Sequence, residues 1–366
     1  MCTNTESIPN ISSPDHLEKR SCICYTHPAM SHLAHIQKHK PSLDLRWEIL
    51  RATREFFWSE GFQEVETPII LRLPGQEPYL SPMKIGIHDE QKRGYTGYLH
   101  TSPEYAMKKM LAAGYEKIFS ICKTFRDYES FGGTHNPEFT MIEWYRTGVD
   151  FWTIMDDCER LLSFIDTSLT NKKIPHAALP LQNPERLHMR DAWQRYAGVN
   201  LDDYLERDTM FALCKKKGYT PDEGEPFDDL FFRIFLNEIE PHLGKEHLTL
   251  LHHYPLSMAA LSKQSADDPR YAERCEMYLG GLELSNGFTE LTDADEQLGR
   301  LQEEQAFRKK MGKEVYDIDM EFIEALRSMP PASGIALGMD RLVQLFGGCQ
   351  NIDGVLVLPA SKLFDT

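Results

Sequence analysis

One continuous stretch, from Lys117 to Arg146, constrains the fold more than any other part of this sequence. It reads KIFSICKTFRDYESFGGTHNPEFTMIEWYR, in which two runs typical of β-strands, Ile118–Phe125 and Glu138–Tyr145, flank a polar loop that contains glycines. Because alternate residues of a strand share a face, the second run is expected to present an acid and a phenol together. The residues of that face are Phe139, Met141, Glu143 and Tyr145.

Charged side chains gather where the first of these strands ends. Arg126 follows the strand directly, and Asp127, Glu129 and His135 lie in the loop behind it. An arginine suits a phosphate because its planar guanidinium donates two parallel hydrogen bonds and keeps its charge. From these residues alone, a phosphate-binding loop and an ordinary hairpin with a solvated loop both remain open.

The segments FRDYE and HNPEFTMIEWYR resemble motif 2 of class II aminoacyl-tRNA synthetases in its lysyl form. The resemblance implies that Arg126 holds the α-phosphate of ATP and that the loop covers the adenine, with Asn136 among the nucleotide-binding residues. Tyr128 separates Asp127 from Glu129, and we expect Glu129 to be the acid that approaches the adenine.

Length and composition limit the class of protein. The 366 residues, 41% hydrophobic and 26% charged, indicate a globular protein with a sizeable core, in one large domain or two ordinary ones. No apolar run is long enough to span a bilayer, and the polar N-terminus lacks the pattern of a secretory signal. The eight cysteines show no zinc spacing and are expected to be reduced thiols in the cytoplasm.

The charge balance bears on possible partners. Forty basic residues against 56 acidic ones give a net charge of −16. Phosphate backbones are bound by clustered Lys and Arg, so the balance argues against a dedicated tRNA-binding surface.

The N-terminal part predicts an extension followed by a helix. Residues 1–40 have little periodicity and are expected to form an extension of uncertain order, before a catalytic domain over 41–366. An apolar stripe predicts a helix over Leu45–Ser59 that Gly61 ends, and then a strand over Phe62–Leu71. This order resembles motif 1 of the same family, which implies a homodimer.

A second helix start lies at Ser102, Pro103 and Glu104, with Ser102 expected as the N-cap and Pro103 as the first helical residue. Glu104 is either a first-turn acid favoured by the helix dipole or a carboxylate in a pocket. The TSPE segment resembles the amino-acid pocket of lysyl enzymes, which implies substrate binding by these three residues together with Tyr145.

The region from 151 to 251 is expected to be mainly helical, without a catalytic signature. Five histidines in or just after this region are more typical of surface or core positions than of a ligand set: His188, His242, His247, His252 and His253. The candidate helices are Asp156–Ile165, Asp191–Ala197, Met210–Gly218 and Phe227–Leu243.

The segment GLELSNGFTEL carries two acids, Glu283 and Glu290, around the turn-forming pair Asn286-Gly287. Two strands joined there would bring both carboxylates to one divalent cation; a surface hairpin with solvated acids is the alternative. The segment resembles the ATP–Mg²⁺ strand of lysyl enzymes. This implies that Glu283 and Leu284 bind the nucleotide, Asn286 and Glu290 the amino acid, and the two acids Mg²⁺.

The last informative segment, Ser333–Phe346, predicts a strand that leads into a helix. A glycine allows close approach of a ligand, and a helix start favours anions. The run GIALGMDR resembles motif 3, which implies that Gly338 lies under the adenine and Arg341 at the γ-phosphate. Ala336 stands where lysyl enzymes generally have glycine and is expected to line the amino-acid pocket.

Together these motifs imply an α+β class II synthetase core, an antiparallel sheet flanked by helices. About 40 residues before motif 1 are too few for the anticodon-binding OB-fold of a lysyl-tRNA synthetase. The combination resembles the truncated lysyl paralogues that use ATP and Mg²⁺ to activate (R)-β-lysine and pass it to elongation factor P. This resemblance implies that Arg126 and Arg341 of the present chain are catalytic. A stand-alone tRNA synthetase, a free amino-acid ligase and a non-catalytic paralogue are the alternatives.

Overall fold

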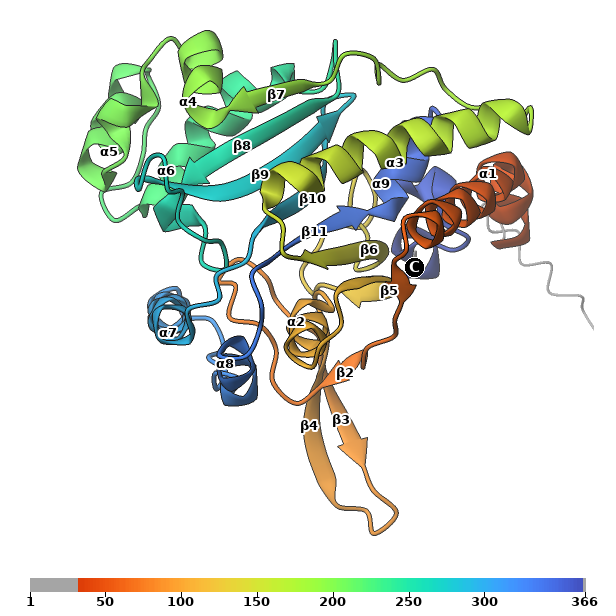
Figure 1. The fold of residues 1–366 in the computed structure, drawn as a ribbon, viewed down its shortest axis with the longest axis horizontal. Helices are drawn as coiled ribbons and strands as arrows, with labels where there is room; N and C mark the ends of the chain where they lie inside the picture. The colour runs from red at the N-terminus through yellow and green to blue at the C-terminus, as the bar shows by residue number, and fades with distance from the viewer. Residues whose placement is uncertain (1–31, 365–366) are drawn as a thin grey trace, which may run out of the picture.

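A computed structural model describes residues 32–364 of the chain. An eight-stranded sheet in the order β1-β5-β6-β11-β10-β9-β8-β7 forms its centre, with helices packed around it (Figure 1). The inner ladders are antiparallel, whereas the outermost pair at each edge is parallel. The predicted α+β architecture of a largely antiparallel sheet flanked by helices is confirmed.

The strand–loop–strand unit is confirmed. Strands β5 (Lys117–Phe125) and β6 (Glu138–Thr147) pair antiparallel. Strand β6 pairs on its other side with β11 (Ala332–Gly338), which leads directly into helix α9 (Met339–Phe346) as predicted. The segments that resemble motifs 2 and 3 are therefore neighbours in the sheet.

The predicted turn at Asn286-Gly287 is wrong. Residues Leu282–Thr289 form one continuous strand, β10, which is hydrogen-bonded to β11 on one side and to β9 (Tyr271–Leu279) on the other. The turn lies earlier, at Gly280 and Gly281, whose φ angles of +61° and +80° suit glycine. Sheet pairing on both sides overrides the local turn tendency of an Asn-Gly pair.

Helix α1 is longer than its predicted range. It runs from His32 to Ser59 and is followed by Gly61 at φ +79°. Residues 32–40, expected to belong to an extension of uncertain order, are therefore helical, and the rest of that extension lies outside the described residues. The domain boundary near residue 40 stays a prediction.

The strand predicted over 62–71 is much shorter in the structure. Only β1 (Gln63–Glu64) and β2 (Ile70–Leu71) are strands, on either side of Pro68. Strand β2 joins β3 (Lys84–His88) and β4 (Gly94–Leu99) in a separate three-stranded sheet. The β3–β4 hairpin projects away from the main sheet (Figure 1).

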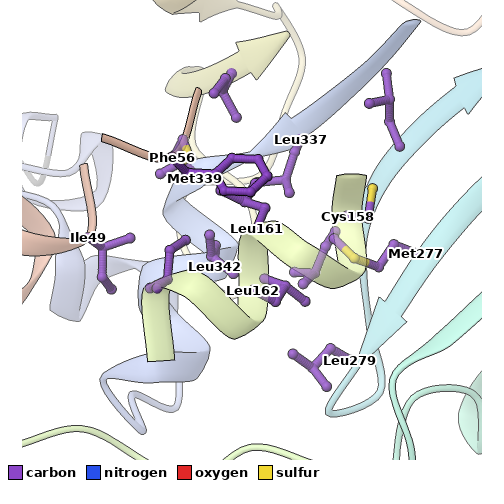
Figure 2. Close-up of a cluster of buried hydrophobic side chains, with 14 of the residues drawn as sticks. Ile49, Phe56, Cys158, Leu161, Leu162, Met277, Leu279, Leu337, Met339 and Leu342 are labelled. Carbon is purple, nitrogen blue, oxygen red and sulfur yellow. The ribbon is translucent and has the colours of Figure 1, made fainter. Parts of the chain in front are cut away.

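One face of the main sheet carries the largest apolar core. Helices α1, α9 and α3 (Phe151–Asn171) pack there with side chains from the strands (Figure 2). Ile142 and Trp144 of β6 point into this core and are fully buried. The alternate residues of β6 therefore face the other side of the sheet.

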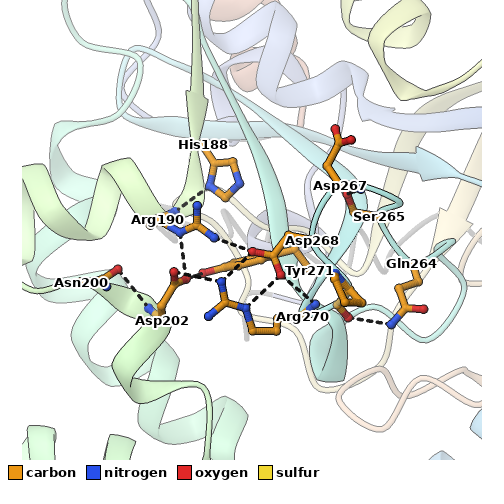
Figure 3. A network of polar contacts seen from close by, with 11 residues as sticks. His188, Arg190, Asn200, Asp202, Gln264, Ser265, Asp267, Asp268, Arg270 and Tyr271 are labelled. Carbon is orange, nitrogen blue, oxygen red and sulfur yellow. Dashed lines mark hydrogen bonds and ion pairs between the residues drawn. The ribbon is translucent and has the colours of Figure 1, made fainter.

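The predicted helical region forms a second apolar core at the β7–β8 end of the sheet. A network of polar contacts also links its segments. Arg190 of α4 binds Asp202 at 2.8 Å and Asp268 at 2.6 Å (Figure 3). The elements of this region are β7 (Glu185–His188), α4 (Met189–Ala192), the π-helix Trp193–Ala197, the 3₁₀ helix Leu201–Tyr204, α5 (Arg207–Lys216), α6 (Phe227–Ile234), the π-helix Phe235–Ile239, the 3₁₀ helix Glu240–His242 and β8 (Thr249–Pro255).

A third cluster packs helices α2 (Glu104–Ala112), α7 (Ala294–Lys310) and α8 (Met320–Leu326) around Tyr145 and Ala332. Helix α2 starts one residue later than predicted, so that Pro103 is its N-cap. The Ser102 hydroxyl still accepts a hydrogen bond from the Glu104 N–H at 3.0 Å. The remaining short helices are Leu256–Met258, Ile352–Val355 and α10 (Ala360–Leu363).

Candidate active site

A cavity of about 240 Å³ lies beside the central strands and collects most of the predicted site residues. It is lined from the β5–β6 loop, from β6, β10 and β11, and from the start of α9. Thirteen of the fifteen predicted residues line it: Ser102, Glu104, Arg126, Glu129, Asn136, Tyr145, Glu283, Leu284, Asn286, Glu290, Ala336, Gly338 and Arg341.

Pro103 and Asp127 are the two predicted residues outside the cavity lining. Pro103 caps helix α2. The Asp127 side chain is exposed and accepts a hydrogen bond from the N–H of Tyr128, which has a φ of +61° and is 91% exposed. The structure thus places Glu129, rather than Asp127, at the cavity.

The alternation predicted for β6 is confirmed at the cavity, since Phe139, Met141, Glu143 and Tyr145 all line it. The Arg126 guanidinium lies 5.0 Å from the centre of the Phe139 ring. An aromatic face beside an arginine is a surface on which a purine can stack. Phe139 had no predicted role, although its place on the strand face was visible in the sequence.

Two arginines meet at this end of the cavity. Arg341 donates hydrogen bonds to the Glu283 carbonyl at 2.8 Å and to the Thr134 carbonyl at 3.3 Å. Burial lowers the pKa of Arg126, while Glu129, Glu77 and Glu283 raise it. Because a guanidinium donates several hydrogen bonds in a fixed fork, both side chains suit a polyphosphate.

Gly338 leaves room at the same end. A Cβ built on it would meet only one protein atom, the Leu284 carbonyl oxygen, at 3.8 Å. A side chain at this position would therefore enter the cavity rather than the protein. This open glycine between two arginines and an aromatic ring fits a nucleotide.

Asn136 is bound to the backbone through both atoms of its amide. Its nitrogen donates to the Glu138 carbonyl at 2.6 Å, and its oxygen accepts from the Ala360 N–H at 2.8 Å. It ties the β5–β6 loop to α10 while it lines the cavity. Its predicted contact with the nucleotide stays a prediction.

The opposite end of the cavity is rich in carboxylates. Glu143 accepts hydrogen bonds from the Ser102 hydroxyl at 2.8 Å and from the Tyr145 hydroxyl at 2.5 Å. Burial, with Glu104 nearby, raises the pKa of Glu143 to about 8. Burial also raises the pKa of Glu290 to about 8, although Lys108 opposes this. Buried acids of this kind suit cationic ligands.

The predicted pair of magnesium ligands is not formed. Glu283 and Glu290 lie at opposite ends of the continuous strand β10, roughly 20 Å apart by the rise of a strand. A bulge between Glu283 and Ser285 turns Glu283 to the cavity side. Glu290 instead contacts Lys108 at 2.5 Å. The prediction that both acids share one cation is therefore wrong.

Glu276 of β9 is the second acid near Glu283. Burial and Glu276 are the two largest causes that raise the pKa of Glu283, to about 7. Within residues 32–364, no group of three or more His, Cys, Asp or Glu side chains is arranged to hold a metal ion. One or two carboxylates do fit Mg²⁺ that takes its other ligands from phosphates and water.

Three residues at or beside the cavity were missed from the sequence: Glu77, Lys108 and Glu276. Lys108 could have been found, because it follows Glu104 by four residues on a helix, the spacing of facing side chains. Glu77 lies in a loop without periodicity, and Glu276 becomes a neighbour of Glu283 only through the β9–β10 turn.

The histidines of the helical region lie apart from the cavity lining. His188 stacks on His253 with ring centres 4.7 Å apart, and the Nδ1 atoms of His252 and His253 are 2.6 Å apart. Burial is the largest cause that lowers the pKa of His252, to about 3. His252 and His253 are buried beside Trp152 and the half-buried His188, and burial is the largest cause that lowers the pKa of all three histidines.

Comparison with known proteins gives a consistent picture. A family model described as tRNA synthetases class II (D, K and N) matches residues 29–362. A protein of Avibacterium paragallinarum named elongation factor P–(R)-β-lysine ligase is 38% identical over 315 residues, 85% of this chain and 92% of that protein. Its namesake from Yersinia enterocolitica is 37% identical over 338 residues, 91% of this chain and 100% of the relative.

Proposed function

Because this chain belongs to the class II tRNA synthetases of the D, K and N type, we propose that it activates (R)-β-lysine with ATP and transfers it to a lysine side chain of elongation factor P. The observation that carries the proposal is the polarity of the cavity, with arginines at one end and buried carboxylates at the other. The printed names of its relatives support this amino acid and this acceptor.

Activation needs little covalent chemistry from the protein. Arg126 would bind the α-phosphate and Arg341 the γ-phosphate, while Phe139 and Gly338 receive the adenine. A carboxylate oxygen of the amino acid attacks the α-phosphorus, and the bond to the β-phosphate oxygen breaks, so that pyrophosphate leaves. Positioning of the reactants and stabilisation of charge then account for the rate.

Glu283, with Glu276 behind it, would hold Mg²⁺. When bound, the ion would supply positive charge to the phosphates during the displacement. Glu276 already accepts a hydrogen bond from Tyr278 at 2.6 Å and one from Arg274 at 2.7 Å. We therefore expect Glu283 to be the direct ligand and Glu276 to keep the local charge negative.

The carboxylate-rich end would bind the amino groups of the substrate. Glu104 and Glu290 would accept from ammonium groups, and Tyr145 would orient the substrate beside Glu143. Ala336 lies between Glu143 and Asn286 in the sheet register, so that its methyl group borders the same space. The shape there would distinguish (R)-β-lysine from α-lysine.

In the transfer step, the unprotonated amine of the acceptor lysine attacks the carbonyl carbon of the adenylate. The bond from that carbon to the phosphate oxygen breaks, AMP leaves, and an amide forms. With a net charge of −16 for the whole chain, a protein acceptor is favoured over tRNA.

We also propose a homodimer through α1 and a cytoplasmic location. Trp47 and Trp58 lie eleven residues apart on one face of α1 and are 49% and 53% exposed. Large exposed aromatic side chains of this kind are typical of protein interfaces.

No helix of residues 32–364 is long and apolar enough to cross a bilayer.

The experiment has two stages. ATP–pyrophosphate exchange is measured with (R)-β-lysine and with α-lysine, and the activated amino acid is then offered to elongation factor P or to tRNA(Lys). We expect exchange with (R)-β-lysine and labelling of elongation factor P alone. Efficient charging of tRNA(Lys) would contradict the proposal and indicate a stand-alone synthetase.

A further inference from the structure

Lys108 is a buried cation at the carboxylate end of the cavity. It extends from helix α2 and is 1% exposed. Its Nζ atom lies 2.6 Å from Glu104 Oε1 and 2.5 Å from Glu290 Oε2. One ammonium group therefore bridges two acids that line the cavity, although Lys108 itself does not line it.

Apolar surroundings strengthen this bridge. The Lys108 ammonium lies 5.1 Å from the ring centre of Phe288 and 5.9 Å from that of Phe322. Away from water, a charge is tolerated only when it is paired. Burial lowers the pKa of Lys108, but Glu104 and Glu290 raise it by more, so that the lysine stays protonated.

Each bridged acid keeps a free oxygen. The bridge uses Oε1 of Glu104 and Oε2 of Glu290. The other Glu290 oxygen, Oε1, is buried and has no hydrogen-bond partner among the described residues. An unpartnered buried oxygen in a cavity wall is a place where a ligand can donate a hydrogen bond.

The charges at this end can be counted. Glu104, Glu143 and Glu290 line the cavity, and among the described residues Lys108 is the basic side chain that pairs with Glu104 and Glu290. Acids therefore outnumber the internal cation here, and Glu77, which also lines the cavity, lies near Glu104. A lysine isomer whose carboxylate has joined AMP carries two ammonium groups, which favour the charged forms of these acids.

We propose that Lys108 is a positioning residue for the substrate: it holds Glu104 and Glu290 as oriented carboxylates and so makes the pocket selective for amino acids with two ammonium groups. This rests on the proposed function for the identity of the substrate. The physical content is that an internal cation holds the two buried acids in place and opposes the burial that favours the protonated form of Glu290, before the ligand arrives.

Loss of the lysine should therefore appear as a change in the pH dependence of binding. The groups that face Glu290 are Lys108, Glu104, Glu143 and Tyr145. Lys108 is the only one of them that lowers the pKa of Glu290. The pKa of Glu290 is about 8 with Lys108 in place; without it, Glu290 holds its proton to a still higher pH, and less of it can accept from an ammonium group at neutral pH.

The test uses Lys108→Met, with Lys109→Met as the matched control. Lys109 lies on the same helix but pairs with Asp319 at 2.6 Å, away from the cavity lining. Pyrophosphate exchange is measured from pH 6.5 to pH 8.5. We expect the KM for (R)-β-lysine to rise about 10–100-fold at pH 7 in Lys108→Met, because Glu290 then holds its proton more tightly.

Three further results complete this expectation. The KM for ATP stays within about twofold of the wild type, the defect shrinks toward pH 8.5, and Lys108→Arg restores part of the loss. An equal loss for ATP and amino acid at every pH would indicate a purely structural role and overturn the proposal. A lower KM for the amino acid would overturn it as well.

Two variants keep the test valid if Lys108→Met does not fold. Lys108→Met/Glu290→Gln removes the pair as a neutral unit, and its raised KM should vary less between pH 6.5 and pH 8.5 than the KM of Lys108→Met. The wild type and Lys108→Arg are also titrated with cadaverine and with pentylamine by calorimetry. Tighter binding of cadaverine by the wild type is expected, whereas equal binding of diamine and monoamine would overturn the charge argument.

These measurements also separate the two proposals. A wild-type protein that exchanges pyrophosphate with neither lysine isomer would refute the proposed function. Cadaverine binding needs no catalysis, so it still decides whether Lys108 sets the charge of the pocket.

Discussion

Arg46 of α1 and Asp340 of α9 form a buried ion pair, with Nη1 and Oδ1 2.5 Å apart. Arg46 also donates to the Thr140 hydroxyl at 2.7 Å, and the Thr140 N–H donates to Asp340 Oδ2 at 2.9 Å. The three segments that resemble motifs 1, 2 and 3 are joined by this single cluster. Because Arg341 follows Asp340 directly, the cluster also places that arginine at the cavity.

Arg46→Met should strongly destabilise the fold. The substitution leaves Asp340 buried without its cation, and breaking a buried pair in this way costs about 3–5 kcal/mol of unfolding free energy. Urea denaturation measures the change. Arg51→Met is the control, because Arg51 is 61% exposed and lies 3.8 Å from Glu48; it should shift stability by less than about 1 kcal/mol. Equal stability of the two variants would show that the pair is unimportant.

Arg126→Ala and Arg341→Ala should each abolish adenylate formation in a folded protein. Both guanidinium groups line the end of the cavity that fits a triphosphate. Removing one such electrostatic contact typically lowers the rate about 10²–10³-fold. Pyrophosphate exchange is the assay, and a thermal melt checks the fold. Arg160→Ala, at an exposed ion pair with Glu60, should retain exchange. Near-normal exchange in a folded Arg126→Ala or Arg341→Ala protein would remove that residue from the mechanism.

Ala336→Gly should shift the preference from (R)-β-lysine toward α-lysine. Ala336 is the cross-strand neighbour of Glu143 and of Asn286 and lines the cavity. A methyl group in a pocket is worth roughly 1–3 kcal/mol, or about 10–200-fold in discrimination. The measurement is the ratio of the two kcat/KM values.

Ala332→Gly is the matched control for this substitution. Ala332 lies on the same strand but is fully buried in the core around α2 and α8. It should lower stability without changing the ratio of kcat/KM values. If Ala336→Gly also leaves that ratio unchanged, Ala336 is not the selector and specificity lies elsewhere in the pocket.

Glu143→Gln should flatten part of the pH dependence of stability in the absence of substrate. Burial raises the pKa of Glu143 from 4.5 to about 8, so the folded protein binds a proton there that the unfolded chain has lost. Its contribution to stability is therefore complete below about pH 4.5 and is lost as pH rises toward 8.

Denaturation of the wild type and of Glu143→Gln between pH 5 and pH 8 tests this sign. The variant should gain about 2–4 kcal/mol relative to the wild type over that range, since one unit of pKa shift corresponds to 1.36 kcal/mol. A constant difference between the two proteins would mean that Glu143 titrates normally.

Local patterns in the sequence were sufficient for much of the fold. Alternation over 138–145 predicted both the strand and the face that lines the cavity, because a strand has a period of two wherever it lies. The strand and helix of Ser333–Phe346 and the candidate helices between 151 and 243 were also predicted from the local sequence. These features depend on neighbours along the chain.

The same holds for most candidate site residues. The segments around Arg126, Glu104, Glu283 and Arg341 each carry their own motif, and the structure brings them to one cavity. The sequence motifs alone identified which types of side chain form the candidate site. The motifs could not identify the partners of these side chains, because a partner is chosen by distance in space.

What the sequence determined by itself is therefore the set of strands and helices and the chemistry that they carry. Only the tertiary structure decided that Asn286 lies within a strand, since pairing with β9 and β11 satisfies its backbone on both sides. It likewise decided that Glu290 binds Lys108 and that Glu276 lies near Glu283. Burial forces each charge to find a partner, and the partner that the fold provides cannot be read from spacing along the chain.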